Sequence, residues 1–362
     1  MRADAGKLRD HVACVRCAGP LDVDAETIAC ERCAQAYGRV GRIPILLPRP
    51  DDHLKAWRQQ LATLSKQGEH TLSALEGELK RPGLSASGET RLRALSRALA
   101  DQVQDIVSIV GPALGGPLEN EANALPRGVV EYIQFLYRDW GWESASNSEN
   151  ARALAALRPL IGSAALGRTI VLGAGACRLA YDLHREFRAS ETAVLDIDPF
   201  LFTIAEAVVR GEPVQLTEST ANVQELAQVA KTWLLRAPAG PLAESEFQFF
   251  LANALAPPFG DHLFDTVVTP WFIDQVSGEL LPFFERVRRL LKPGGRFINS
   301  GPLLYPAEAP LARRHCREEI FELLAQAGFR LEQYASESRP HLESPLNGRG
   351  KIEWILSFVA FS

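Results

Sequence analysis

The chain has 362 residues, of which 46% are hydrophobic and 23% are charged, and its net charge at pH 7 is −5. A domain usually holds ~100–200 residues, so this length predicts two or three folded units. No run of ~18 apolar residues is present to cross a membrane. The segment Met1–Val12 carries charges of both signs and lacks the apolar core of a secretory signal. The negative net charge argues against a protein that binds nucleic acid through its phosphates. We expect a cytoplasmic protein without a membrane partner.

Four of the six cysteines lie within twenty residues, in two pairs: Cys14-x-x-Cys17 and Cys30-x-x-Cys33. Two such pairs can hold one tetrahedral Zn²⁺ with four thiolates, which leaves no open position for chemistry. Unliganded thiols or a redox pair are the alternative, but they would leave a segment of forty residues almost without a core. We predict a structural zinc ribbon over residues 1–50, closed by a strand at Pro44–Pro48.

A helical region is predicted over residues 51–150. Leucines and isoleucines recur at three- and four-residue spacing in His53–Lys66 and Thr90–Val110, as they do in amphipathic helices. Glycine and proline predict turns at Arg81–Gly83 and at Gly111–Pro117.

Short apolar runs alternate with helical segments over residues 151–362. This alternation predicts an α/β fold with a doubly wound, mostly parallel, Rossmann-like sheet. The segment Gly211–Glu246 is longer than a strand–helix link needs, so we expect it to be an insertion over the site. The strands predicted here are Thr169–Leu172, Thr192–Ile197, Phe247–Leu251, Thr266–Thr269, Arg296–Asn299 and Ile352–Phe361, with helices at Leu280–Leu291 and Glu318–Ala327.

The run Val171-Leu-Gly-Ala-Gly-Ala-Cys-Arg178 is typical of a strand, a glycine turn and then a helix. Gly173 and Gly175, with Ala174 between them, let the backbone turn sharply and approach a ligand closely. The following helix, Leu179–Phe187, directs its amide dipole at the same place. A lone Gly-x-Gly is weak evidence because dinucleotide enzymes and plain turns use it too, so the later segments have to decide.

A carboxylate follows the glycine turn by about twenty residues. Asp196 ends the next strand, where it can accept hydrogen bonds from both hydroxyls of a ribose. A nicotinamide dehydrogenase requires a third glycine in the turn, but this run contains only two. S-adenosylmethionine has no pyrophosphate and does not need that glycine. The pattern therefore favours a class I S-adenosylmethionine-dependent methyltransferase.

The ends of the later strands agree with this interpretation. Asn253 and Ala254 follow the third strand, where methyltransferases often hold the adenine amine. Thr269 ends the fourth strand, and the turn Leu291–Gly295 precedes the fifth, as is usual in this class. The cofactor-binding residues predicted in this domain are Gly173, Ala174, Gly175, Asp196, Asn253, Ala254 and Thr269.

Three segments together resemble the carnosine N-methyltransferase family: Tyr137-Arg-Asp-Trp140, Phe272-Ile-Asp274 and Ile298-Asn-Ser-Gly-Pro-Leu-Leu-Tyr305. The resemblance extends from about Val130 to Phe361 and includes the long insertion. It implies that Arg138 reaches the cofactor carboxylate and that Asp274 faces the substrate. Tyr305 either lines the substrate pocket or packs against its neighbours.

Departures from the family pattern concern the substrate. The family has a substrate-contacting histidine where this chain has Pro306, and a glutamate where it has Asp196. Substrate-binding tyrosines of the last strand are replaced by Lys351, Ile352 and Glu353. We therefore expect the fold and the cofactor to carry over, and we expect an acceptor different from carnosine.

Asp274 is the predicted catalytic residue, together with Tyr305. Its carboxylate could hold an N–H of an imidazole or amine, orient the lone pair and stabilise the positive charge that develops on methyl transfer. The structural alternative is a helix N-cap, a common role for aspartate at a strand–helix junction. The predicted acceptor is a small molecule or a peptide.

Two other functions stay open. The zinc ribbon resembles ribbons that precede certain large-subunit rRNA guanine methyltransferases, so a methyltransferase acting on an rRNA or tRNA base is one alternative. A basic surface would indicate this function, and the ribbon segment contains Arg16, Arg32, Arg39 and Arg42.

The other alternative function is a scaffold that binds a cofactor or partner without turnover. A blocked pocket would indicate it. The oligomeric state is open, with a homodimer among the options.

Overall fold

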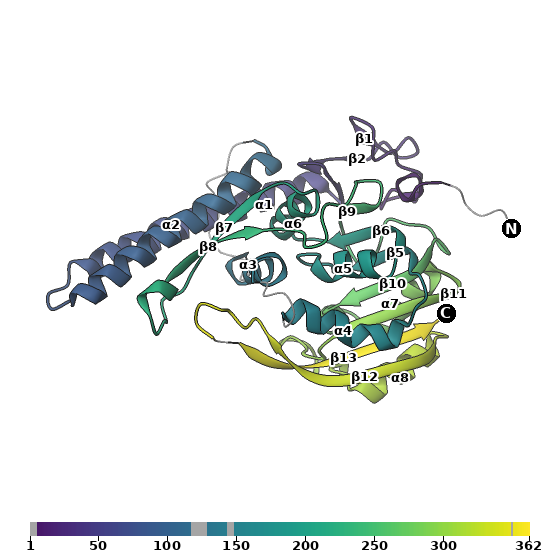
Figure 1. Cartoon of the computed structure of the whole chain (residues 1–362). Coiled ribbons are helices and arrows are strands. Elements are labelled where there is room, and N and C mark those ends of the chain that lie inside the picture. The colour runs from purple at the N-terminus through teal and green to yellow at the C-terminus, as the bar shows by residue number, and fades with distance from the viewer. Residues whose placement is uncertain (1–5, 117–128, 143–147, 349) are drawn as a thin grey trace.

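The computed structural model describes residues 6–116, 129–142, 148–348 and 350–362. Its centre is a nine-stranded sheet in the order β12-β13-β11-β10-β5-β6-β9-β4-β3 (Figure 1). In that spatial order the strands are Arg330–His341, Lys351–Phe361, Leu291–Gly301, Phe264–Pro270, Gly167–Leu172, Ala189–Asp196, Phe247–Ala252, Ile43–Leu46 and Arg39–Val40.

The inner strands are parallel, which confirms the doubly wound α/β fold predicted from the alternation of strands and helices. At one edge β13 is antiparallel to β11, and β12 is antiparallel to β13. The chain runs outward from β5 to β6 and β9, and then returns to form β10 on the other side of β5. The carboxyl ends of β5 and β10 thus mark the topological switch point, where open α/β sheets bind their ligands.

Each face of the sheet has its own apolar core. Val171 of β5 points into a core shared with helices α1 to α6, whereas Ile170 and Leu172 point into one shared with α7, α8 and the N-terminal segment. The helices are α1 (Pro50–Leu79), α2 (Ala86–Leu114), α3 (Val129–Leu136), α4 (Glu149–Ile161), α5 (Arg178–Glu186), α6 (Pro199–Val209), α7 (Leu280–Leu290) and α8 (Arg317–Gln326). A π-helical turn, η2, spans Tyr137–Gly141, and short 3-10 turns span Leu8–His11, Leu226–Gln228, Ile273–Gln275 and Leu311–Arg313.

All six strands predicted for residues 151–362 are present, with bounds shifted by a few residues. The sequence did not predict β12, the outermost strand. Most of its residues are exposed, only its last three are consistently covered, and few carry apolar side chains, so no hydrophobic period marks it. Backbone pairing with β13 along the whole strand holds it in the sheet.

Helices α1 and α2 lie side by side and project from the sheet (Figure 1). Both are longer than the sequence pattern predicts. The turn expected from Gly111 onward is wrong, because α2 continues through Pro112 to Leu114 and ends at Gly115 with φ of 60°. Val110 and Leu114 are buried, and their packing offsets the one helical hydrogen bond that Pro112 cannot donate. No helix in the described part of the chain has the length and apolarity that crossing a bilayer requires.

The expected insertion Gly211–Glu246 contains a hairpin of two strands, β7 (Val214–Ser219) and β8 (Ala230–Leu235). This hairpin packs against α2 (Figure 1). The Thr217 N–H donates to Oδ2 of Asp105 in α2 at 2.8 Å, and the Thr217 carbonyl accepts from the Tyr137 hydroxyl at 2.7 Å.

The N-terminal segment is joined to the central sheet. It holds a two-stranded sheet of β1 (Ile28–Ala29) and β2 (Ala36–Tyr37), followed by β3 and β4. The strand expected at Pro44–Pro48 corresponds to β4, which pairs antiparallel with β3 and parallel with β9. The expected closing strand of the ribbon is therefore also a strand of the central sheet.

Candidate functional site

A cavity of about 800 Å³ lies at the carboxyl ends of the central strands. Its lining comes from the turn after β5, the ends of β6, β9 and β10, and helices α1, α3, α4 and α6. Of the cofactor-binding residues predicted from sequence, the cavity brings together Arg138, Gly173, Ala174, Gly175, Asp196, Asn253 and Ala254. No residue of the hairpin β7–β8 lines it, so the insertion does not cover this cavity as the sequence had suggested.

The glycine turn after β5 needs both of its glycines. Gly173 has φ of 70° and Gly175 has φ of 55°, a region that residues with a Cβ rarely adopt. A Cβ on Gly173 would also lie 2.2 Å from Cδ2 of Phe272, whereas a Cβ on Gly175 would meet open space. Gly173 therefore permits the close approach of the Phe272 ring, and Gly175 permits the turn.

Asp196 at the end of β6 is tied to the glycine turn. Its Oδ2 accepts from the Gly175 N–H at 2.8 Å, and its Oδ1 accepts from the N–H groups of Ile197 at 2.7 Å and Asp198 at 3.0 Å. Burial raises the pKa of Asp196, and these three backbone N–H groups oppose the rise. The carboxylate lines the cavity and keeps lone pairs that can accept from a ligand.

Apolar groups flank this carboxylate. Ile197 lines the cavity and is 60% exposed, although isoleucine usually packs inside a protein. Ala254, after β9, lines the same cavity and is buried. The Asn253 side chain accepts from the Leu255 N–H at 2.9 Å, which fixes the turn after β9. The cavity thus offers a carboxylate beside an apolar slot.

The motif Tyr137–Trp140 positions two charged groups at the cavity. It forms the π-helical turn η2, a conformation that often occurs at functional sites. The Trp140 indole N–H donates to the Ala176 carbonyl at 2.8 Å and so anchors the motif to the glycine turn. Arg138 Nε donates to Asp139 Oδ1 at 2.6 Å, and Arg138 Nη1 lies 3.5 Å from Glu149 Oε1. Coulombic attraction to these two carboxylates raises the pKa of Arg138 despite its burial.

Sequence reasoning missed a cluster on the other side of Glu149. His341, at the end of β12, lies 2.9 Å from Glu149 through its Nδ1, and its ring stacks on Trp271 at 4.1 Å between centroids. Trp271 follows β10 and has φ of 52°, a strained conformation of the kind that collects at functional sites. The position of Trp271 directly after a central strand could have indicated a site residue from sequence. Nothing in the local sequence marks His341 or Glu149.

Thr269 does not line the cavity. It is fully buried in β10, and its hydroxyl donates to Asn299 Oδ1 of the neighbouring β11 at 2.9 Å. The cavity is lined instead by the next residues along the chain, Pro270 and Trp271.

Asp274 lies next to the cavity and not in its lining, which includes its neighbours Phe272 and Gln275. The side chain is 2% exposed and caps no described helix, because Oδ2 accepts from the distant Leu304 N–H at 3.2 Å. Oδ1 is buried and accepts no hydrogen bond of good geometry from the described residues. Burial raises the pKa of Asp274 to about 6. The described contacts therefore do not support the alternative that Asp274 is a helix N-cap.

Tyr305, like Asp274, has a buried polar atom that lacks a hydrogen-bond partner of good geometry among the described residues. Its hydroxyl is buried and makes no hydrogen bond of good geometry within the described part of the chain. Burial and then the charge of Asp274 raise the pKa of Tyr305. The charge of Glu353 in β13 also raises the pKa of Asp274. Buried polar atoms are normally satisfied, so this pair fits a ligand that carries hydrogen-bonding groups.

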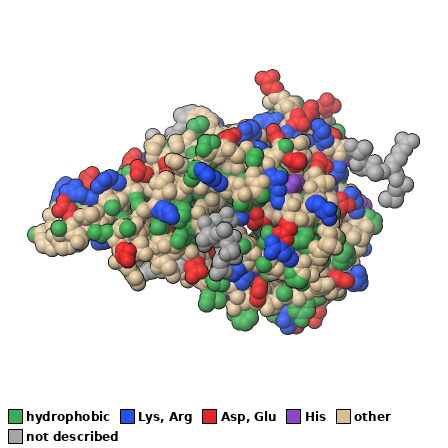
Figure 2. Space-filling view, viewed as in Figure 1, with side chains coloured by type: hydrophobic (Ala, Val, Ile, Leu, Met, Phe, Trp, Pro, Cys, Tyr) green, Lys and Arg blue, Asp and Glu red, His purple; other side chains and the backbone are tan. Residues whose placement is uncertain are grey.

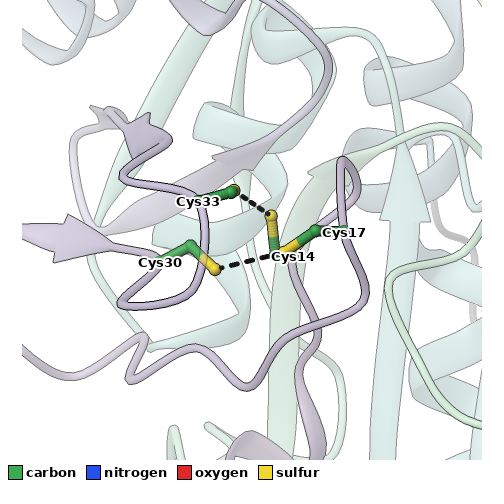
Figure 3. A group of neighbouring side chains, drawn as sticks. All are labelled: Cys14, Cys17, Cys30 and Cys33. Atoms are coloured by element: carbon green, nitrogen blue, oxygen red, sulfur yellow. Dashed lines mark hydrogen bonds between the residues drawn. The ribbon is translucent and has the colours of Figure 1, made fainter.

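The four cysteines of the N-terminal segment come together, as Figure 3 shows. Their sulfur atoms all lie within 4.8 Å of one another, with 3.6 Å between Cys14 and Cys33 and 3.5 Å between Cys17 and Cys30. Four thiolates on one Zn²⁺ at ~2.3 Å would stand ~3.8 Å apart, so the set fits a tetrahedral zinc ion. All six cysteines are free of disulfides.

The two cysteine pairs form matching turns. Ala18 and Ala34, each directly after a pair, both have φ of 56°. The Ala18 N–H donates to the Cys14 carbonyl at 2.8 Å, and the Ala34 N–H donates to the Cys30 carbonyl at 2.8 Å. This repeated geometry presents four sulfur atoms to one point and leaves no position for a substrate, as in structural zinc sites.

Comparison with known proteins finds a family match over part of the chain. A family model described as "Carnosine N-methyltransferase" matches residues 190–341. The carnosine N-methyltransferases of Rattus norvegicus and Mus musculus are each 38% identical to the chain over 71 residues. That match covers 19% of this chain and 18% of each relative, so it spans less than a fifth of the length of these curated relatives.

Solved structures give a weaker likeness. An S-adenosylmethionine-dependent methyltransferase from Aquifex aeolicus aligns with a TM-score of 0.38 and 13% identity, over 65% of this chain and 99% of its own. One from Mesorhizobium loti aligns with a TM-score of 0.38 and 16% identity, over 60% of this chain and 99% of its own.

The matched region contains the end of β6, the turn after β9 and the 3-10 turn that carries Asp274. The glycine turn and Arg138 precede it in sequence, and the structure brings them to the same cavity. Residues 190–341 of the chain thus resemble the carnosine N-methyltransferase family, over less than half of the chain.

Proposed function

We propose that this chain is an S-adenosylmethionine-dependent N-methyltransferase that binds its cofactor in the 800 Å³ cavity. The observation that carries the proposal is the position of Asp196. Its half-buried side chain ends β6 beside the glycine turn and the exposed Ile197, next to the switch point of the sheet. A nucleoside needs this combination of a hydroxyl acceptor and an apolar surface.

Each part of the cofactor has suitable groups in the cavity. Asp196 would accept hydrogen bonds from the ribose hydroxyls, and the adenine would pack between Ile197 and Ala254. The turn at Gly173 leaves room for the amino-acid portion, whose carboxylate would be attracted by Arg138. When bound, S-adenosylmethionine supplies an electrophilic methyl group on a sulfonium.

The acceptor would be oriented by Asp274. An ionised Asp274 Oδ1 can accept the N–H of an imidazole or amine, which points the lone pair of the reacting nitrogen away from the carboxylate. It would also stabilise the positive charge that develops on that nitrogen. The Tyr305 hydroxyl and the charge of Glu353 add an acidic, hydrogen-bonding surface that suits a cationic acceptor. Holding the nitrogen ~3 Å from the methyl group would then supply much of the rate.

The acceptor is proposed to be a nitrogen nucleophile other than carnosine, on a small metabolite or a peptide. Pro306 follows Tyr305 and offers neither a side-chain polar atom nor an N–H. The last strand presents Lys351 and Ile352 to solvent where the family has tyrosines.

The RNA alternative draws no support from the arginines of the ribbon. Arg39 donates to the carbonyls of Val23 and Ala25, and Arg42 pairs with Glu206 and Glu212. Arg32 and Arg16 are exposed, but Arg32 also donates to the Cys17 carbonyl at 3.3 Å. The face drawn in Figure 2 intersperses acidic and basic side chains and shows no continuous basic surface.

Calorimetry with S-adenosylhomocysteine tests the proposal. Binding at micromolar strength, on the order of −8 kcal/mol, is expected. A screen of fractionated cell extract with S-adenosylmethionine labelled in the methyl group should then reveal the acceptor. Binding of a nicotinamide dinucleotide in place of S-adenosylhomocysteine would overturn the assignment.

A further inference from the structure

One wall of the cavity comes from the N-terminal segment, outside the region that matches the carnosine N-methyltransferase family. Strand β4 pairs in parallel with β9, so that Leu46 lies opposite Ala252. The chain then enters the cavity lining with Leu47 and Pro48, beside Asn253 and Ala254. The wall therefore borders the slot in which the adenine is proposed to pack.

Helix α1 continues this wall. His53, Trp57 and Gln60 line the cavity one helical turn apart, and the rings of His53 and Trp57 lie 5.7 Å apart. Trp57 is 5% exposed and belongs to the same apolar core as Leu47. We refer to Leu47, Pro48, His53, Trp57 and Gln60 together as the N-terminal wall.

Hydrogen bonds link the cysteine cluster to this wall. The Tyr37 hydroxyl lies 3.0 Å from Cys14 Sγ and accepts from the Val15 N–H at 3.2 Å. Eight residues further on, the Ile45 N–H donates to the Gly38 carbonyl at 2.9 Å, which ties β4 to the chain directly after Tyr37. Leu47, which lines the cavity, is two positions beyond Ile45 along the same strand and its extension.

The cluster also shares an apolar core with the sheet. Cys14 and Cys30 are buried in one core with Leu46, Ala252 and Ala254. The Ala13 N–H donates to the Pro258 carbonyl at 2.8 Å, which joins the first cysteine turn to the loop after β9. The sequence pattern suggested a separate ribbon, whereas these contacts make the cysteine cluster one side of the core that supports the adenine slot.

We propose that the N-terminal wall is part of the cofactor-binding site, and that metal held by the four cysteines sets the position of this wall and hence the affinity for the cofactor. Without the metal, four thiols packed at these distances lose the bonds that hold the two cysteine turns together. The turn at Tyr37, β4 and Leu47 would then become mobile, while the rest of the sheet keeps its own core. This inference rests on the proposed binding of S-adenosylmethionine to the cavity.

The first test is calorimetry with S-adenosylhomocysteine on the full chain loaded with zinc, then treated with a chelator, and then reloaded with zinc. Chelation should weaken binding about tenfold, as expected for losing one apolar wall of the slot, and reloading should restore it. Cys17→Ser should behave like the chelated protein, and Cys316→Ser, which alters an exposed cysteine outside the cluster, should behave like the zinc-loaded one.

Circular dichroism on the same samples shows how far the effect extends. Equal affinity with and without zinc would overturn the proposal. So would a general loss of secondary structure on chelation, because the proposal confines the effect to a local segment. Failure of the zinc-loaded chain to bind S-adenosylhomocysteine would instead count against the proposed function, so the two failures can be told apart.

A pair of variants tests the wall without touching the metal. His53 and His70 lie on the same helix, but His53 lines the cavity and His70 is exposed outside its lining. His53→Ala should weaken the binding of S-adenosylhomocysteine roughly threefold or more, while keeping its zinc, because the adenine slot loses a packed ring. His70→Ala should leave both unchanged. Equal affinities of the two variants would remove the wall from the cofactor site.

Discussion

The Gly175 N–H donates to Asp196 Oδ2 at 2.8 Å, and this hydrogen bond joins the turn after β5 to the end of β6. The two groups that the sequence pattern singles out for the cofactor therefore hold each other in place before any ligand arrives. Asp198 extends the arrangement, because its carboxylate caps α6 by accepting from the N–H groups of Phe200 and Leu201. The site is organised by the backbone and needs little rearrangement to bind a nucleoside.

Asp196→Asn should weaken the binding of S-adenosylhomocysteine by about 1–3 kcal/mol. The amide keeps the size of the carboxylate but loses its charge, and its NH₂ group faces backbone donors at Gly175 or at Ile197 and Asp198. Calorimetry measures the change, and Asp261→Asn, an exposed change outside the cavity, serves as the control. An affinity equal to that of the control would remove Asp196 from the ribose site.

The binding of S-adenosylhomocysteine should also depend on pH through Asp196. Burial raises the pKa of this carboxyl in the free protein, and the ionised form is the one that accepts two ribose hydroxyls. The affinity should therefore fall as the pH is lowered through that raised pKa. The Asp196→Asn variant should lack this dependence when it is measured over the same pH range.

Gly173→Ala should abolish detectable binding of the cofactor and lower stability. The added Cβ would lie 2.2 Å from the Phe272 ring at a φ of 70°, so the turn and the ring must both move. A loss of about 1–3 kcal/mol of unfolding free energy is expected from strain of this kind. Gly240→Ala also has positive φ but meets open space outside the cavity lining, so it isolates the backbone effect. Equal behaviour of the two variants would show that the contact with Phe272 is unimportant.

Asp274→Asn should reduce turnover far more than it reduces cofactor affinity. The ionised carboxylate is the proposed hydrogen-bond acceptor for the substrate, so the rate should rise with pH through the pKa of about 6 and then level off. The variant should lack that rise. Labelled-methyl assays over pH 5 to 8 with the acceptor from the extract screen measure both. A variant with normal turnover would leave Asp274 a purely structural role.

Stability gives a second readout of Asp274 that needs no substrate. The folded pKa of Asp274, about 6, lies above the ordinary value of 3.8, so the folded state binds more protons than the unfolded state between these values. The contribution of Asp274 to stability is thus present at low pH and is lost as the pH rises through about 6. Above that pH, Asp274→Asn should be the more stable protein by an amount on the order of 2 kcal/mol, measured by urea unfolding.

Pro306→His should increase the methylation of carnosine. A histidine can donate or accept a hydrogen bond beside Tyr305, which proline cannot do, and one such bond is worth ~1–3 kcal/mol, or about 5- to 150-fold in kcat/KM. The unsubstituted chain should methylate carnosine poorly. Assays of carnosine and of extract-derived acceptors side by side check both statements. Efficient carnosine methylation by the unsubstituted chain would contradict the role given to Pro306.

The chain should contain about one zinc per molecule by elemental analysis. The four sulfur atoms lie within 4.8 Å of one another and match the edges of a ZnS₄ tetrahedron. The thiols of these cysteines should resist alkylation until a chelator is added, whereas the exposed Cys316 should react at once. A zinc-free chain with all four thiols freely alkylated would refute the ribbon.

Some parts of this protein could be predicted from sequence because local patterns determine them. The cysteine spacing fixes which sulfur atoms can converge, since a short turn leaves them few conformations. The strand–glycine–helix pattern at Gly173 and Gly175, and Asp196 after the next strand, predict that these residues share one cavity, because parallel strands bring their carboxyl ends to one edge. The six apolar strands are visible for the same local reason.

The tertiary structure alone decided the rest. The pairing of β4 with β9, the stacking of His341 on Trp271 and the contact of Glu149 with His341 all join residues distant in sequence. A hydrophobic period marks which face of an element is buried, but it does not say which neighbour covers that face. That choice depends on packing and on the pairing of backbone groups across the whole sheet. For this reason the sequence predicted a ribbon and a cofactor site, and only the folded chain showed that residues of the N-terminal segment line the same cavity as the glycine turn.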